Sequence, residues 1–228
     1  MNSSKDKYNH LIKNLEISSS KNSIFSKKLG QKAFLSLGQG NLCEWLEELL
    51  PNTRLIIEPK IIGSIIGIQY LNGELSKAIN QNCGNITKQV KSLKSVPNKL
   101  PIKKRIEIRG VLYGEEKTSI KNNDKKCIGP QQTHIEPKGY NFCAYQIYHC
   151  KINHFQALQE LKNLAFEIPE TQFTNFTSDI DLYYQCWKEG KLFTSYPTSG
   201  IVVKINSRKL QKDLGENNLS IHWAYAIT

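Results

Sequence analysis

The chain is organised around Leu55-Ile56-Ile57-Glu58-Pro59-Lys60-Ile61-Ile62-Gly63, an apolar stretch that carries one acid and one lysine two residues apart. Successive side chains of a β-strand alternate between its faces, so we expect Glu58 and Lys60 to project to the same side of a sheet. The apolar run 64–70 predicts a second strand. The dipeptide Asn72-Gly73 predicts a hairpin turn after it.

Lys60 has two interpretations when this stretch is considered alone. A lysine held at a strand end among isoleucines is partly desolvated, and desolvation lowers the pKa of an amine and makes it a nucleophile. The alternative is a lysine on the solvent-facing side of an edge strand, where charged residues are common. The residues of the strand by themselves favour the second interpretation.

Five collinear segments change that weighting. Glu58–Gly63 resembles the Glu-x-Lys-x-Asp-Gly motif of NAD-dependent DNA ligases. The later matches follow the order of that family: Tyr70-Leu71-Asn72-Gly73-Glu74-Leu75, Ser95-Val96-Pro97, Ile106-Glu107-Ile108-Arg109-Gly110 and Gly200-Ile201-Val202-Val203-Lys204-Ile205-Asn206. The resemblance implies the α+β nucleotidyltransferase fold of DNA ligases and mRNA-capping enzymes, in which antiparallel sheets surround a nucleotide cleft and helices flank them.

The same resemblance implies roles for individual residues. Lys60 would be the nucleophile that attacks the α-phosphate of NAD, forming lysyl-AMP and releasing nicotinamide mononucleotide. Glu58 would accept a hydrogen bond from the purine. Arg109 and Lys204 would supply positive charge for the phosphate. The remaining implied nucleotide-binding residues are Ser36 and Leu37, at the nucleoside, and Gly63. We expect the amines of Lys60 and Lys204 to point into one cleft.

Several polar positions of the family are replaced in this chain. Three acids become Ile62, Val111 and Ser199, one arginine becomes Asn80, and the last lysine becomes Thr228. Each catalytic polar group commonly contributes ~10²–10⁴-fold in rate, although losses within one site do not add. We therefore expect impaired or absent adenylation. Mg²⁺ is a cofactor that the family implies, but its usual acids are among the replaced residues.

Two function hypotheses follow. The first is an enzyme, an NAD-dependent ligase-like adenylation domain that works in DNA repair or replication, alone or with a separate protein. The second is a catalytically inactive module that binds a nucleotide (NAD or AMP) or nucleic acid. Retention of Lys60 and Lys204 favours the first. The replaced acids favour the second, as does the expected lack of the family's accessory domains.

Composition limits the partners. The chain has 228 residues, of which 39% are hydrophobic and 22% charged, so it suits a globular protein. Its net charge of +11 favours a polyanion, so we expect weak DNA binding without sequence specificity. No apolar run approaches the ~20 residues that span a bilayer, and no signal peptide is evident. We therefore expect a cytoplasmic protein without a membrane partner.

The domain organisation predicted from composition is simple. Residues 1–28 are rich in Ser, Asn and Lys, and predict a flexible basic arm, while 29–228 predict one adenylation domain. Cys143, His149, Cys150 and His154 lie close together in the sequence and suggest zinc. They lack the paired spacing of zinc sites, so we expect no metal there. The aromatic residues of 180–188 could stack on bases, but their helical spacing favours core packing.

Overall fold

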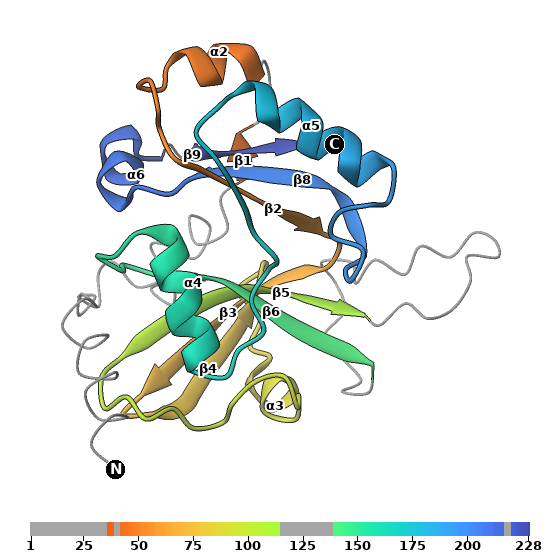
Figure 1. The fold of residues 1–228 in the computed structure, drawn as a ribbon. Helices are drawn as coiled ribbons and strands as arrows, with labels where there is room; N and C mark the ends of the chain where they lie inside the picture. The colour runs from red at the N-terminus through yellow and green to blue at the C-terminus, as the bar shows by residue number, and fades with distance from the viewer. Residues whose placement is uncertain (1–35, 39–41, 115–138, 217–219) are drawn as a thin grey trace. The chain divides into compact units, whose positions relative to one another are not determined.

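The computed structural model of the chain describes residues 36–38, 42–114, 139–216 and 220–228 (Figure 1). The predicted arm at 1–28 lies outside these residues. The described chain divides into two compact units. Unit 1 contains residues 63–114, 139–152 and 156–168, and unit 2 contains 36–38, 42–62, 153–155, 169–216 and 220–228. No helix in the described ranges is long and apolar enough to cross a membrane.

Unit 2 contains a five-stranded sheet in the order β1-β9-β8-β2-β7. Its strands are β1 (Ser36–Gly38), β2 (Leu55–Ile61), β7 (Gln172–Thr174), β8 (Thr198–Ile205) and β9 (Ser220–Ile227). All neighbours are antiparallel except β1 and β9, which are parallel. The helices of this unit are α2 (Leu42–Glu47), α5 (Ser178–Lys188) and α6 (Arg208–Leu214), and α5 runs beside β8 (Figure 1).

The register of β2 against β8 divides the side chains of unit 2 between two faces. Ile56 pairs with Lys204 and Glu58 with Val202, and directly paired residues project to the same side. The intervening residues of both strands project to the other side and join a buried cluster of Leu55, Ile57, Ile201, Val203 and Ile205. The aromatic residues of α5, Tyr183, Tyr184 and Trp187, pack against this cluster, which confirms their core interpretation.

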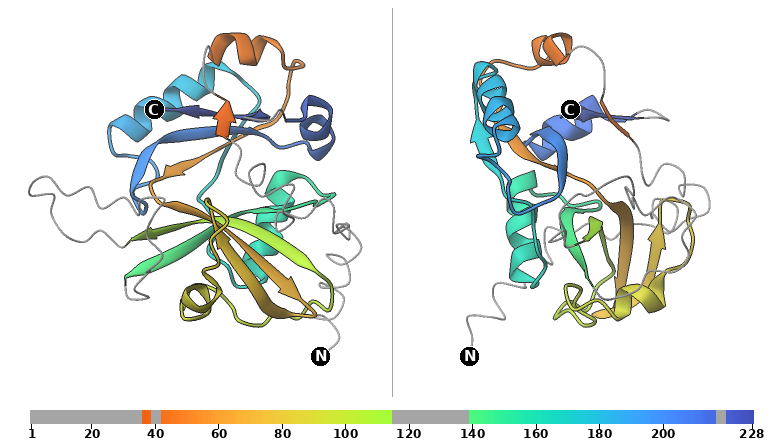
Figure 2. Two further views of the ribbon diagram at one scale, coloured as in Figure 1. Left: turned by 180° about the vertical axis from the view of Figure 1, so that it is seen from behind. Right: turned by 90° about the vertical axis from the view of Figure 1, so that its right-hand side faces the viewer.

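Unit 1 contains an antiparallel four-stranded sheet in the order β4-β3-β5-β6. Its strands are β3 (Ser64–Leu71), β4 (Glu74–Asn80), β5 (Ile106–Gly114) and β6 (Tyr140–Ile147). Two helices accompany them, α3 (Thr87–Lys91) and α4 (His154–Asn163). In Figure 2, α3 and the chain after it lie beside β4. One buried cluster contains Ile66, Ile68, Ile108 and Leu112 of the sheet with Leu158 and Leu161 of α4.

The predicted hairpin turn is confirmed. Asn72 and Gly73 have φ angles of 52° and 86°, and Leu71 pairs with Glu74 across this two-residue loop. Positive φ at both central positions is the turn whose twist matches the flanking strands. Beyond this turn, α2 ends at Glu47, and Glu167 makes an isolated parallel bridge with Cys143 of β6.

Candidate functional site

A buried ion cluster lies on one face of the unit 2 sheet. The Glu58 carboxylate accepts from Lys204 Nζ through one oxygen and contacts His154 Nε2 through the other, each at 2.6 Å. All three side chains are buried. Lys204 lies diagonally across the β2–β8 ladder, because Glu58 is paired with Val202, two residues earlier on β8. The cluster therefore joins β2, β8 and the start of α4.

Opposing effects set the charge of each member. Burial alone would raise the pKa of Glu58, but the charges and hydrogen bonds of Lys204 and His154 outweigh it and lower that pKa to about 2. Burial lowers the pKa of His154, and this effect exceeds the opposing attraction of Glu58. The pair at neutral pH is therefore a carboxylate and a neutral imidazole. An ionised carboxylate only accepts, so His154 Nε2 carries the proton and donates.

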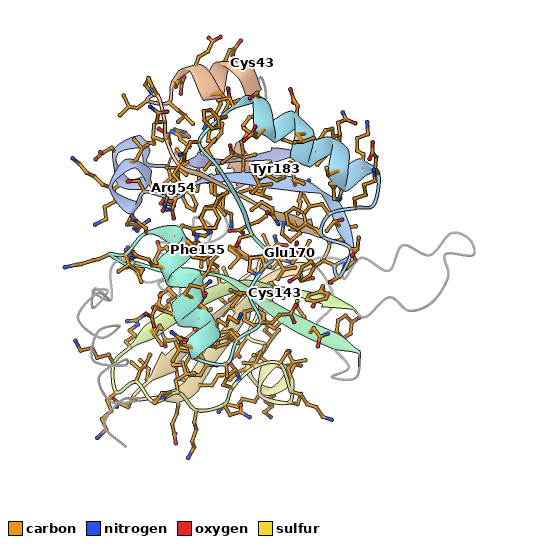
Figure 3. All side chains as sticks on the ribbon, in the orientation of Figure 1. Cys43, Arg54, Cys143, Phe155, Glu170 and Tyr183 are labelled. Atoms are coloured by element: carbon orange, nitrogen blue, oxygen red, sulfur yellow. The ribbon has the colours of Figure 1, made fainter. Side chains whose placement is uncertain are left out.

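The sequence did not assign His154 to this site. Asn206, which follows β8, fixes the start of α4, because its carbonyl accepts from the His154 backbone N–H at 2.9 Å and its Oδ1 from the Phe155 N–H at 3.0 Å. The neighbouring Phe155, labelled in Figure 3, packs edge-on against Phe173 with ring centroids 4.7 Å apart. His154 lies 96 residues from Glu58, and no local pattern links the two.

Lys60 lies on β2 two residues beyond Glu58, and its side chain is half-buried. Regular alternation along β2 would place this side chain on the face of Glu58 and Lys204. β8 carries one extra residue opposite Lys60, since Pro59 pairs with Ile201 and Ile61 with Thr198. Such bulges bend a strand and redirect the neighbouring side chains. Whether Lys60 acts as the nucleophile stays a prediction.

Three positions at which the chain departs from the family pattern, Asn80, Ser199 and Ile62, lie in different surroundings. Asn80 Oδ1 accepts from the backbone N–H groups of Asn82 and Gly84 at 3.0 and 2.8 Å, so it closes the turn that follows β4. Ser199 is half-buried in the bulge of β8, and Ile62 is exposed. Within the described ranges, no three His, Cys, Asp or Glu side chains are grouped so that they could hold a metal ion.

Arg109 and Gly63 belong to unit 1. Arg109 is buried on β5, donates to Gln146 Oε1 at 3.3 Å and lies over the Tyr148 ring at 4.4 Å. Its Nε is buried without a hydrogen-bond partner among the described residues. A Cβ at Gly63 would lie 2.3 Å from the Leu112 carbonyl oxygen, so the local packing itself requires glycine there.

Two more predicted residues lie on β1. Leu37 is half-buried and packs against the hydrophobic cluster of unit 2, while Ser36 pairs with Ser220 of β9. Their expected contact with a nucleoside stays a prediction. The structure therefore brings Glu58 and Lys204 into direct contact, with Lys60 on the same strand as Glu58.

Comparison with known sequences confirms the resemblance. Residues 32–138 match the family model of the NAD-dependent DNA ligase adenylation domain. The chain is 29% identical over 201 residues to a DNA ligase of Mesoplasma florum, covering 77% of this chain and 30% of that protein. It is 26% identical over 247 residues to a DNA ligase of Metamycoplasma arthritidis, covering 93% of this chain and 37% of that protein. The chain thus spans about a third of these relatives' length.

Comparison with solved structures confirms the fold. An archaeal ATP-dependent RNA ligase aligns with a TM-score of 0.51 at 14% identity, covering 76% of this chain and 45% of that one. The two sheets with their few helices form the α+β nucleotidyltransferase fold that DNA and RNA ligases share.

Proposed function

We propose that this chain, similar to the adenylation domain of NAD-dependent DNA ligases, binds an adenine nucleotide but adenylates itself slowly or not at all. The observation that carries the proposal is the buried cluster of Glu58, Lys204 and His154, whose Glu58 lies on β2 two residues before Lys60. Desolvated charges cost folding free energy, several kcal/mol each when unpaired. A cluster of this kind is more commonly kept for binding or chemistry than for stability.

The residues of the cluster suit the edge of a purine. A carboxylate offers about four lone-pair positions, of which the protein uses two on Glu58, so a ligand amino group can still be accepted. Lys204 donates to Glu58 and places a positive charge beside this carboxylate. A base whose amino group donates to Glu58 would therefore lie next to a cation on the same face of the sheet.

Lys60 would form the covalent bond in the reaction that the family implies. Its Nζ would bond to the α-phosphorus of NAD, the bridging P–O bond would break, and nicotinamide mononucleotide would leave as the amine lost a proton. The family acid after the lysine is Ile62 here, so no carboxylate at that position takes the proton or holds the amine. Poor positioning commonly costs several kcal/mol of barrier, so the step should be severely slowed.

The described residues do not fit Mg²⁺. Magnesium prefers carboxylate oxygens with water and substrate phosphates. Three positions that carry acids in the family are Ile62, Val111 and Ser199 here, and the described part of the chain contains no group of three or more His, Cys, Asp or Glu side chains that could hold a metal ion. No step is therefore assigned to a metal.

Calorimetric titration with AMP and with NAD tests the binding proposal. We expect both to bind wild type, and Lys204→Met or Glu58→Gln to weaken the affinity by at least about tenfold, as for lost charge-assisted hydrogen bonds. Lys212→Met, a lysine exchange on α6, is the matched control and should bind normally. Absence of AMP binding by folded wild type would overturn the proposal.

DNA is the partner that the net charge of +11 favours. Phosphate contacts alone give weak, sequence-independent binding that falls steeply with salt.

We further propose that residues 29–228 work as one adenylation-type domain in DNA repair or replication. The relatives that support this role are named DNA ligases, and the chain covers about a third of their length.

A further inference from the structure

The segment between β4 and β5 is the most one-sided charged region of the chain. Residues 81–105 contain seven cations and no acid: Lys88, Lys91, Lys94, Lys99, Lys103, Lys104 and Arg105. The stretches 42–53 and 169–187 show the opposite pattern, with three acids each and no Lys or Arg. The excess of positive charge is therefore concentrated, and an even spread of lysines does not explain it.

The segment is held firmly along the free edge of β4. At one end, the Ile86 N–H donates to the Ala78 carbonyl at 3.0 Å. At the other, the Leu100 N–H donates to Gly73 at 2.7 Å, and Lys99 forms a bridge with Glu74. β4 is the outer strand of its sheet, so this segment covers an edge that would otherwise expose backbone groups.

The pattern that anchors the segment also directs its lysines outward. Its apolar residues are buried in the unit 1 core: Ile86, Val90, Leu93, Val96, Leu100 and Ile102. Lys88, Lys91 and Lys94 alternate with them at intervals of three and are exposed. The result is a row of cations on a fixed support, and Figure 2 shows this part of the chain beside β4.

Lys99 and Arg105 of the same segment form ion pairs with Glu74 and Glu107, so they are not counted in the row. We propose that the row itself, Lys88, Lys91 and Lys94, is a docking surface for the phosphate backbone of duplex nucleic acid. Residues 81–105 contain no Phe, Tyr or Trp. Surfaces for single strands usually stack bases on aromatic side chains, so the absence of aromatics favours a duplex. Lysine ammonium groups contact phosphates and carry no base code, so binding is independent of sequence. The inference rests on the proposed function, which makes nucleic acid the partner.

The test compares two triple variants of the full chain by fluorescence anisotropy with one labelled DNA duplex. The first is Lys88→Gln/Lys91→Gln/Lys94→Gln. The control, Lys191→Gln/Lys209→Gln/Lys212→Gln, removes the same charge from exposed positions of unit 2. Each phosphate contact contributes about one unit to the slope of log affinity against log salt. We expect the first variant to lower that slope by about 3 and the low-salt affinity by roughly tenfold or more.

The control should retain the slope and the affinity of wild type, and the labelled single strand should bind wild type more weakly than the duplex does. Equal weakening by both variants, an unchanged slope in the first, tighter binding of the single strand, or no DNA binding by wild type would each overturn the inference. AMP titration of the same samples separates this failure from failure of the proposed function, because these lysines lie outside the nucleotide cluster. Circular dichroism confirms that each variant is folded.

Discussion

Glu58 is a buried carboxylate whose charge depends on two neighbouring side chains. Its side chain is buried, and its charge is compensated by Lys204 and by the proton of His154 at 2.6 Å each. Removing one partner of a buried pair commonly costs 3–5 kcal/mol, roughly, because the other charge is left without compensation. The residues that we propose for purine binding are therefore also residues on which folding depends.

Unfolding free energy should fall in two stages as the solution is acidified. The folded chain favours neutral His154, because burial lowers the pKa of this side chain. The contribution of His154 to the free energy of unfolding is therefore present above its ordinary pKa of 6.5 and is lost as the pH falls below that value. The pKa of Glu58 is 4.5 ordinarily and about 2 when folded. Its contribution, on the order of 3 kcal/mol, is therefore present above pH 4.5 and lost as the pH falls towards 2.

Urea unfolding of wild type and Glu58→Gln across this pH range measures the two stages. We expect the variant to be less stable at neutral pH, because Lys204 is left buried without its counter-charge, and to lack the lower stage. A variant that loses stability below pH 4.5 as steeply as wild type does would contradict the assignment.

At the scale of the element, the bulge of β8 depends on one glycine. Gly200 has a φ of +149°, a region that residues with a side chain rarely adopt, and a Cβ there would lie 2.0 Å from the Ile227 carbonyl oxygen of β9. Neither the backbone of β9 nor that of β8 can move without breaking the ladder that holds Lys204 against Ala224.

Gly200→Ala should therefore destabilise the chain by more than about 3 kcal/mol, through strain and a steric clash together. Gly114→Ala on β5 is the control, since the nearest atoms to its added Cβ are 3.8 Å away. We expect the control to change the free energy of unfolding by less than about 1 kcal/mol. Similar losses from both substitutions in urea unfolding would show that the bulge has no special requirement for glycine.

Strongly periodic elements were predictable from the sequence, and long-range ones were not. β2, β3 and α5 were expected from the apolar runs 55–63 and 64–70 and from the helical spacing of the aromatic residues of 180–188, and the structure places each within a few residues of expectation. α6 and β7 are short and were not predicted, because tertiary contacts decide such elements. The site divides in the same way. Motifs identified Glu58 and Lys204, whereas His154 is brought to them by Asn206 through a contact that no local pattern encodes.

At the scale of the whole molecule, the described chain has two separate hydrophobic cores. The cluster around Ile108 and Leu158 belongs to unit 1, and that around Ile57 and Val203 belongs to unit 2. They share no residue. A large-to-small substitution in one core should therefore weaken mainly the unit that contains it.

Native-state hydrogen exchange of Leu158→Ala checks this independence. We expect a loss of about 2–5 kcal/mol in the protection of β3, β5 and β6, because a buried leucine is removed from their core. Protection of β2, β8 and β9 should change little, and Val203→Ala should show the reverse pattern. A uniform loss over both sheets in either variant would mean that the two units unfold as one.

Intact mass after incubation with NAD is the most direct test of the claim that the adenylation site is degenerate. We expect wild type and Lys60→Ala to show no gain in mass, and the variant Ile62→Asp/Val111→Glu/Ser199→Asp, which restores the replaced acids, to gain one AMP. Positioned acids should recover part of the several kcal/mol that positioning contributes. A gain of one AMP on wild type that Lys60→Ala abolishes would contradict the account.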